Sequence, residues 1–175
     1  MKNNLLKYNL IGFVFVSILG TLSHFAFEWS GYSYAVAFLC PVNESTWEHL
    51  KLLFFPYLIW TVAEYYIMKK ESGIIISKSI GAAAGMLAIA IFYYTYTGMW
   101  GKSIDILNIL SFFIGVSVSF ITDSRLIKSK KLKKSGLNAL GIAIFIAIGA
   151  MFFIFTVAPP LIPLFKDPIT SAYGI

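Results

Sequence analysis

The stretch Pro-Val-Asn-Glu-Ser-Thr-Trp-Glu-His-Leu-Lys, residues 41–51, stands at the start of a strongly apolar segment. It brings Glu44, Glu48, His49 and Lys51 together where the chain turns apolar. Ionisable groups in or next to a bilayer are costly, so they usually pair, line a water-filled cavity or serve a function. The stretch therefore predicts the start of a membrane helix and is the first place to look for a site.

Composition indicates a protein solvated by lipid. The chain has 175 residues, of which 58% are hydrophobic and only 13% are charged, and its mean hydropathy is +0.78. A soluble domain carries roughly 25% charged residues. The length suits one transmembrane domain spanning residues 1–175. Cys40 is the single cysteine, which excludes an intrachain disulfide.

Five apolar stretches are long enough to cross a bilayer, since a membrane helix needs about 20 mainly apolar residues. They cover residues 8–29, 47–68, 74–96, 104–122 and 137–158. The second contains Pro56, which neighbouring helices in a membrane can accommodate. The sequence thus predicts an all-α integral membrane helical bundle with about five transmembrane helices.

Basic residues alternate between the loops and predict the orientation. Lysines precede the first span, and further basic residues follow the second and the fourth, whereas the other loops are nearly free of them. These residues are Lys2, Lys7, Lys69, Lys70, Lys78, Arg125, Lys128, Lys130, Lys131, Lys133 and Lys134. Under the positive-inside rule we expect a multi-pass protein of the cell membrane, with the N-terminus inside and the C-terminus outside. No Ala-x-Ala-like cleavage site follows the first span, so we expect it to be retained. The formal charge of +6 is explained by topology, and no nucleic acid partner is expected.

Small residues at four-residue spacing predict where the helices pack against each other. Gly81 and Gly85 form one such step. The two later spans carry the series Ser111, Gly115, Ser119 and the series Ala139, Ala143, Ala147. We expect contacts inside one bundle; the alternative is a homo-oligomer through Gly81 and Gly85. Membrane lipids are the other expected partners.

The first span carries a polar end on its small-residue face. Ser17, Gly20, His24 and Glu28 fall within about 80° of arc at 100° per residue, so His24 and Glu28 should face inward. The predicted topology places them beside residues 41–51, at the outer end of the bundle. Glu64 and Asp123 fall at the opposite, cytoplasmic side, where we expect lysines to pair with them.

Two interpretations of residues 41–51 remain open. In the structural one, Ser45 or Asn43 caps a helix, Glu48 completes a capping box, and Lys51 neutralises a carboxylate. In the functional one, the polar side chains form a pocket. Its expected ligand-binding residues are His24, Glu28, Asn43, Glu44, Glu48, His49 and Lys51.

Histidine and carboxylate side chains are suitable ligands for zinc or another divalent transition metal. The candidate metal ligands are His24, Glu28, Glu44, Glu48 and His49. A metal-free alternative uses Glu28, Glu48 and His49 as candidate catalytic acids and bases. The motif His-Glu-x-x-His is absent, and the adjacent Glu48 and His49 diverge by about 100° on a regular helix.

The segment Pro41–Lys51, preceded by His24, Glu28 and Trp29, resembles a family of small bacterial multi-pass membrane proteins. These share the pattern Pro-Val-Asn-Glu-Ser-x-Trp-Glu-His-x-Lys, preceded by a histidine and by an acidic residue before a tryptophan. The resemblance covers the first two spans and implies a shared site, without implying its chemistry.

Three functions are compatible with the sequence. The first is an outward-facing polar His/Glu pocket that binds a small polar or lipid-headgroup ligand. The second is a membrane-embedded hydrolase or transferase that uses a metal or a Glu/His acid-base pair. The third is a structural or accessory membrane subunit. No Gly-x-Ser-x-Gly, Walker or zinc-cysteine motif points to a named class of enzyme.

Overall fold

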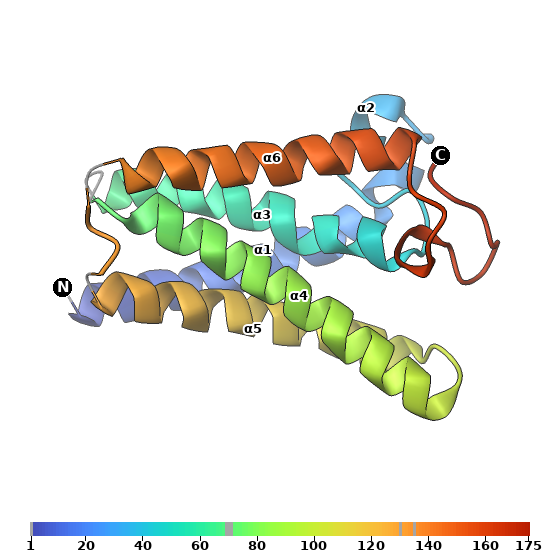
Figure 1. The fold of residues 1–175 in the computed structure, drawn as a ribbon, viewed down its shortest axis with the longest axis horizontal. Helices are drawn as coiled ribbons and strands as arrows, with labels where there is room; N and C mark the ends of the chain where they lie inside the picture. The colour runs from blue at the N-terminus through green and yellow to red at the C-terminus, as the bar shows by residue number, and fades with distance from the viewer. Residues whose placement is uncertain (1, 69–71, 130, 135) are drawn as a thin grey trace.

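The computed structural model describes residues 2–68, 72–129, 131–134 and 136–175, with side chains from Leu5 onward. Within these ranges the regular secondary structure is helical, apart from one isolated bridge between Lys166 and Tyr173. The long helices are α1 (Lys2–Trp29), α3 (Thr46–Ile67), α4 (Ile74–Trp100), α5 (Asp105–Ser129) and α6 (Leu137–Val157). Two short ones, α2 (Tyr34–Ala37) and η1 (Pro163–Phe165), flank them. The long helices form one bundle with the chain termini at opposite ends (Figure 1). Lys69, Lys70 and Lys130, used in the orientation argument, lie outside the described residues.

In the described part of the chain, four helices are long and apolar enough to cross a membrane: α1, α4, α5 and α6. They indicate a membrane protein. The remaining long helix, α3, coincides with the second predicted span but is less apolar, because it carries Glu48, Lys51 and Glu64.

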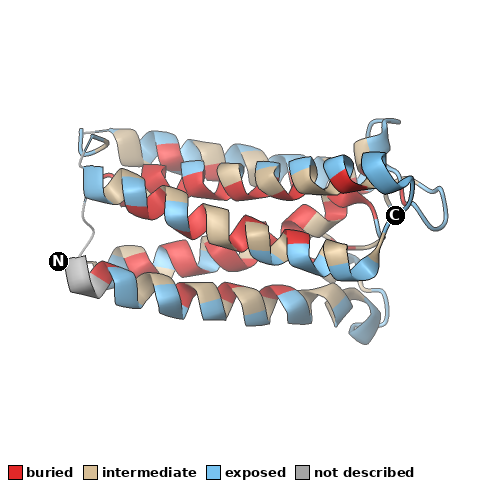
Figure 2. Cartoon of the chain, turned by 90° about the horizontal axis from the view of Figure 1, so that it is seen from below, coloured by how far each residue is buried: buried red, intermediate tan, exposed pale blue. Residues whose placement is uncertain are grey.

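Helix α3 lies at the centre of the bundle. It packs against α1, α4, α5 and α6, and buried residues recur along much of its length. Figure 2 shows buried residues mainly in the interior of the bundle and exposed ones mainly on its outer faces. Phe54 and Tyr57 of α3 are fully buried against the core residues Val16, Val116 and Phe152. Burial on several sides explains how a helix with three charged residues can sit in an apolar bundle.

The start of α3 follows the structural interpretation of the sequence. Ser45 is the N-cap, and its hydroxyl accepts a hydrogen bond from the Glu48 backbone N–H. The Glu48 side chain does not return to Ser45 as in a full capping box. It accepts instead from the backbone N–H of Val42, at 3.1 Å.

Helices α4 and α5 pack closely through the small residues that the sequence singled out. A Cβ atom built on Gly85 would lie 1.9 Å from the hydroxyl oxygen of Ser119 and 2.6 Å from the carbonyl oxygen of Gly115. A Cβ atom built on Gly81 would lie 2.8 Å from the carbonyl oxygen of Ser119. The predicted contact inside one bundle is confirmed. A homo-oligomer through Gly81 and Gly85 would have to displace α5.

The predicted packing face of α6 is wrong. Ala139, Ala143 and Ala147 are exposed, whereas Gly141 and Phe145 are buried. A Cβ atom on Gly141 would lie 2.6 Å from the backbone nitrogen of Ile76 in α4. One glycine permits this close approach, so the face that contains Gly141 becomes the contact face in place of the alanine series.

Candidate functional site

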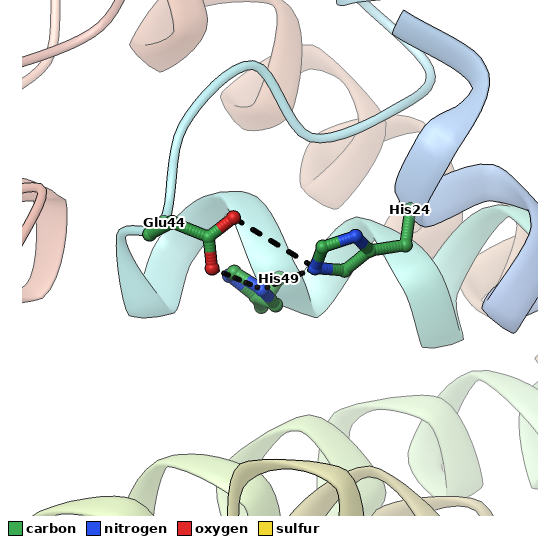
Figure 3. Close-up of side chains that lie close together, drawn as sticks. All are labelled: His24, Glu44 and His49. Carbon is green, nitrogen blue, oxygen red and sulfur yellow. Dashed lines mark hydrogen bonds and ion pairs between the residues drawn. The ribbon is translucent and has the colours of Figure 1, made fainter. Parts of the chain in front are cut away.

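Three metal-ligating side chains converge where α1 nears its end and α3 begins. His24 comes from α1, Glu44 from the loop before α3 and His49 from the first turn of α3 (Figure 3). The Nε2 atoms of the two histidines are 3.2 Å apart. Oxygens of the Glu44 carboxylate lie 3.3 Å from His49 Nε2 and 3.8 Å from His24 Nε2.

These separations match the coordination shell of a single small metal ion. Ligand atoms about 2.0–2.1 Å from zinc at tetrahedral angles lie roughly 3.3 Å from one another. One ligand atom from each of the three residues lies within 4.8 Å of the others, and this is the one such group of three or more among the described residues. Two imidazoles and one carboxylate form a recognised ligand set for catalytic zinc, in which the fourth position is left open.

The backbone orients the His49 ring for this role. His49 Nδ1 lies 3.0 Å from the carbonyl oxygen of Ser45, which can only accept, so Nδ1 carries the proton and donates. The Nε2 atom is then the one that faces His24 and Glu44. Metal-binding histidines commonly donate their second ring N–H to a carbonyl or carboxylate in this way, which fixes the ring orientation.

The surroundings of Glu44 favour its ionised form. Its hydrogen bond with His49 lowers the pKa of the Glu44 carboxyl below its ordinary value, against the opposing effect of partial burial. The charges of His49 and His24 lower the pKa of Glu44 further. In the absence of metal, a proton on His49 Nε2 serves this hydrogen bond. Metal binding at Nε2 would therefore displace a proton.

A cavity of about 290 Å³ adjoins the cluster. Its lining includes Glu44 and His49 of the cluster and Asp105 and Asn108 of α5. Its wall also includes hydroxyl-bearing and apolar side chains, with no lysine or arginine among the lining residues: Thr46, Leu52, Ile89, Tyr93, Ser103, Ser111, Phe112, Pro168 and Ile169. The cluster thus opens onto a space large enough for a small polar group.

Glu28 does not join the site, contrary to expectation. Its side chain is exposed and makes no hydrogen bond or ion pair with the described residues. The inward stripe of α1 holds through Gly20, whose Cβ position lies 2.5 Å from the Leu52 carbonyl oxygen, and through His24. Glu28 lies one turn further on, at the end of the helix, beyond the contact with α3.

Glu48 and Lys51 form a buried ion pair and are not free for a metal or ligand. Lys51 Nζ lies 2.6 Å from Glu48 Oε2, and the two side chains are 0% and 2% exposed. Lys51 also donates to the hydroxyl of Thr156 in α6 at 2.6 Å and to the carbonyl of Ala37 in α2 at 2.8 Å. Thr156 in turn donates to Glu48 Oε1 at 3.1 Å. The pair therefore joins α2, α3 and α6.

Asn43, expected as a ligand residue, shapes the backbone. Its Oδ1 atom accepts from the N–H of Ser45 at 2.9 Å, and its Nδ2 atom donates to the carbonyl of Gly174 at 3.0 Å. It holds the turn before α3 and ties the C-terminal segment to it.

Sequence reasoning missed a second buried cluster, formed by Tyr57, Glu64, Lys78 and Asp123. The expected pairing of Glu64 and Asp123 with a lysine is present, at Lys78. Lys78, however, was read as part of a basic loop, whereas it lies in the second turn of α4 and is fully buried. The signal that could have revealed it was a single lysine inside an otherwise apolar span.

Comparison with known proteins yields one match. A family model described as a family of unknown function (DUF6512) matches residues 1–175. No curated protein and no solved structure matches the chain.

Proposed function

We propose, for a chain that belongs to the DUF6512 family of unknown function, that His24, Glu44 and His49 bind a divalent transition metal, zinc first among them. The observation that carries the proposal is the convergence of two Nε2 atoms and a carboxylate at 3.2–3.8 Å. Ligands of this kind and at these separations suit zinc better than magnesium or calcium, which prefer oxygen. A metal held by these three residues would keep a coordination position for a further ligand, and the adjoining cavity would hold a small polar ligand or lipid headgroup there.

The lining of the cavity supports a neutral ligand. The carboxylates of Glu44 and Asp105 would balance the charge of a divalent metal ion, Asn108 and the hydroxyl groups supply hydrogen bonds, and no lysine or arginine is among the lining residues. A hydroxyl-bearing headgroup fits this environment, and its oxygen could complete the metal shell.

Zinc binding tests the function directly. We expect the purified protein to bind one zinc ion. The variants His24→Ala, His49→Ala and Glu44→Gln should each weaken binding by more than about 100-fold, because each leaves only two protein ligands for the metal. Affinity should fall as the pH is lowered, since imidazole must shed its proton to bind metal. Competition with a chromogenic zinc chelator measures both effects.

Glu28→Gln is the matched control. It removes a carboxylate from the same helix as His24 without touching the cluster, so zinc affinity should stay at the wild-type value. Wild-type protein that fails to compete with a micromolar chelator, or ligand variants that bind zinc as well as Glu28→Gln does, would refute the metal site.

We further propose that the chain crosses the cell membrane five times, with the N-terminus in the cytoplasm and the metal site outside. Support comes from the odd number of long helices among the described residues and from the termini at opposite ends of the bundle (Figure 1). In a Cys40→Ser background, an impermeant maleimide should label Ser171→Cys on intact cells and leave Ser129→Cys unlabelled until the cells are opened. The reverse pattern would invert the topology.

The same geometry favours a hydrolase or transferase as the second candidate. A three-ligand zinc site leaves a position for water, and bound water becomes a nucleophile near neutral pH. His49 would then act as a metal ligand, whereas Glu28 and Glu48 would have no catalytic part. Zinc-dependent cleavage of a headgroup ester, lost in His24→Ala, would distinguish this function from simple binding.

A further inference from the structure

A second polar cluster lies entirely inside the bundle, where α3, α4 and α5 meet. Lys78 Nζ lies 2.6 Å from Glu64 Oε2 and 2.7 Å from Asp123 Oδ2, and the hydroxyl of Tyr57 donates to the same Asp123 oxygen. All four residues are 0% exposed. This cluster is formed by residues other than those of the metal site.

The packing of the helices creates room for it. Tyr57 and Glu64 are two turns apart on α3 and so share a face. Gly81 of α4 lies opposite: a Cβ atom there would be 2.8 Å from the Tyr57 hydroxyl oxygen and 3.2 Å from the Asp123 Cβ. The Lys78 ammonium also lies over the Phe120 ring, 4.7 Å from its centroid. The helices α3, α4 and α5 therefore pack tightly around the charged groups of the cluster.

The charges in the cluster do not balance. Glu64 and Asp123, if both ionised, carry two negative charges against the single positive charge of Lys78, and no other cation forms an ion pair with them among the described residues. An uncompensated charge in a low-dielectric interior is very costly, and two carboxylates at one site resist ionising together. Tyr57 donates a hydrogen bond but brings no positive charge.

Two carboxylate oxygens in the cluster also have no partner. Glu64 Oε1 and Asp123 Oδ1 are buried and lack a hydrogen bond to any described residue. A proton on one carboxyl group would remove the excess charge and would occupy one of these oxygens. The excess negative charge and the unpaired carboxylate oxygens are thus both explained by one bound proton.

We infer that Glu64 and Asp123, held around Lys78 and Tyr57, form a proton-binding site inside the membrane-spanning bundle. One proton is shared by the two carboxyl groups at neutral pH. Lys78 is the fixed counter-charge for the carboxylate that remains ionised, and Tyr57 orients Asp123. The proton belongs to the pair rather than to either residue. Buried acidic groups of this kind are the usual means by which membrane proteins exchange protons.

Infrared spectroscopy of the full-length protein tests the site, because a protonated carboxyl group has a C=O stretch that a carboxylate lacks. At neutral pH we expect one buried protonated carboxyl in the wild type and none in Glu64→Gln or Asp123→Asn, since each variant leaves one carboxylate facing one ammonium. Lys78→Met should show two. Glu28→Gln, which alters an exposed carboxylate, should leave the wild-type band unchanged.

Thermal unfolding provides a second measurement that does not depend on folding of Lys78→Met. The native wild type keeps a proton that its unfolded chain releases above about pH 4.3, so rising pH favours the unfolded state. The melting temperature of the wild type should therefore fall relative to that of Glu64→Gln as the pH rises above about 5. Absence of the protonated band in the wild type, its full persistence in both single variants, or parallel melting profiles would each overturn the inference.

Discussion

The Lys51→Met variant is expected to lose about 3–5 kcal/mol of unfolding free energy, because it leaves the Glu48 carboxylate buried without its counter-charge. The wild-type pair is almost completely enclosed, with Lys51 at 0% and Glu48 at 2% exposure. The variant also loses the hydrogen bonds that Lys51 donates to Thr156 and Ala37, which tie α6 and α2 to α3. For a chain of this length the melting temperature should fall by roughly 6–20 °C. Detergent-solubilised thermal unfolding measures the change.

The double variant Glu48→Gln/Lys51→Met is the control. It removes both charges and keeps an oxygen at position 48 that can still accept from Thr156. It should be more stable than Lys51→Met alone, which is the sign of a coupled pair. If the double variant is at least as unstable as the sum of the two single changes, the loss comes from packing and the buried-charge explanation fails.

Gly141→Ala is expected to destabilise the fold by about 1–3 kcal/mol through overpacking, although alanine favours a helix over glycine by about 1 kcal/mol. The added Cβ would meet Ile76 at its backbone, 2.6 Å from the nitrogen and 2.7 Å from Cα. Backbone atoms cannot rotate away as a side chain can, so α4 and α6 must separate along their contact. Thermal unfolding and protease resistance both report the change.

Gly149→Ala is the matched substitution in the same helix. Its new Cβ would meet only Phe54, at an ordinary contact distance of 3.9 Å. We expect stability equal to or above that of the wild type, by up to about 1 kcal/mol of helix propensity. Equal losses in the two alanine variants would show that α6 is insensitive to its distance from α4.

Sequence periodicity and length predicted the helices well. The predicted starts at residues 47, 74, 104 and 137 lie within one residue of those of α3, α4, α5 and α6. Small-residue spacing predicted the α4–α5 contact but not that of α6. The reason is that an alanine series and a single glycine are both acceptable packing faces, and only the partner helix decides between them.

The sequence predicted only some of the residues that converge at the candidate site. Topology and helical phase brought His24 near residues 41–51, and the structure places it against Glu44 and His49. The same reasoning included Glu28 and Glu48. Helical phase predicts the side of the helix from which a side chain projects, but not which neighbouring residues it meets at that level of the bundle. Glu28 lies one turn too far along its helix, and Glu48 points to Lys51 and Thr156.

The buried position of Lys78 could not be read from charge alone. Its neighbours in sequence, Lys69 and Lys70, made it look like the end of a basic loop. Gly73, with a φ of +86°, is the N-cap that starts α4 at Ile74, and this places Lys78 inside the helix, facing Glu64 and Asp123. The start of the helix at Ile74, rather than the local composition, therefore determines that Lys78 lies in the core.

The central position of α3 has a consequence for how the protein is made. The charged residues Glu48, Lys51 and Glu64 lie towards the two ends of α3, and each of them lowers the tendency of this helix to insert on its own. Glu64 gains its counter-charge from Lys78 of α4, and Glu48 gains a hydrogen bond from Thr156 of α6, both synthesised later. If α3 crosses the membrane, we expect it to enter the bilayer together with α4, with the α3–α4 hairpin as the unit of insertion.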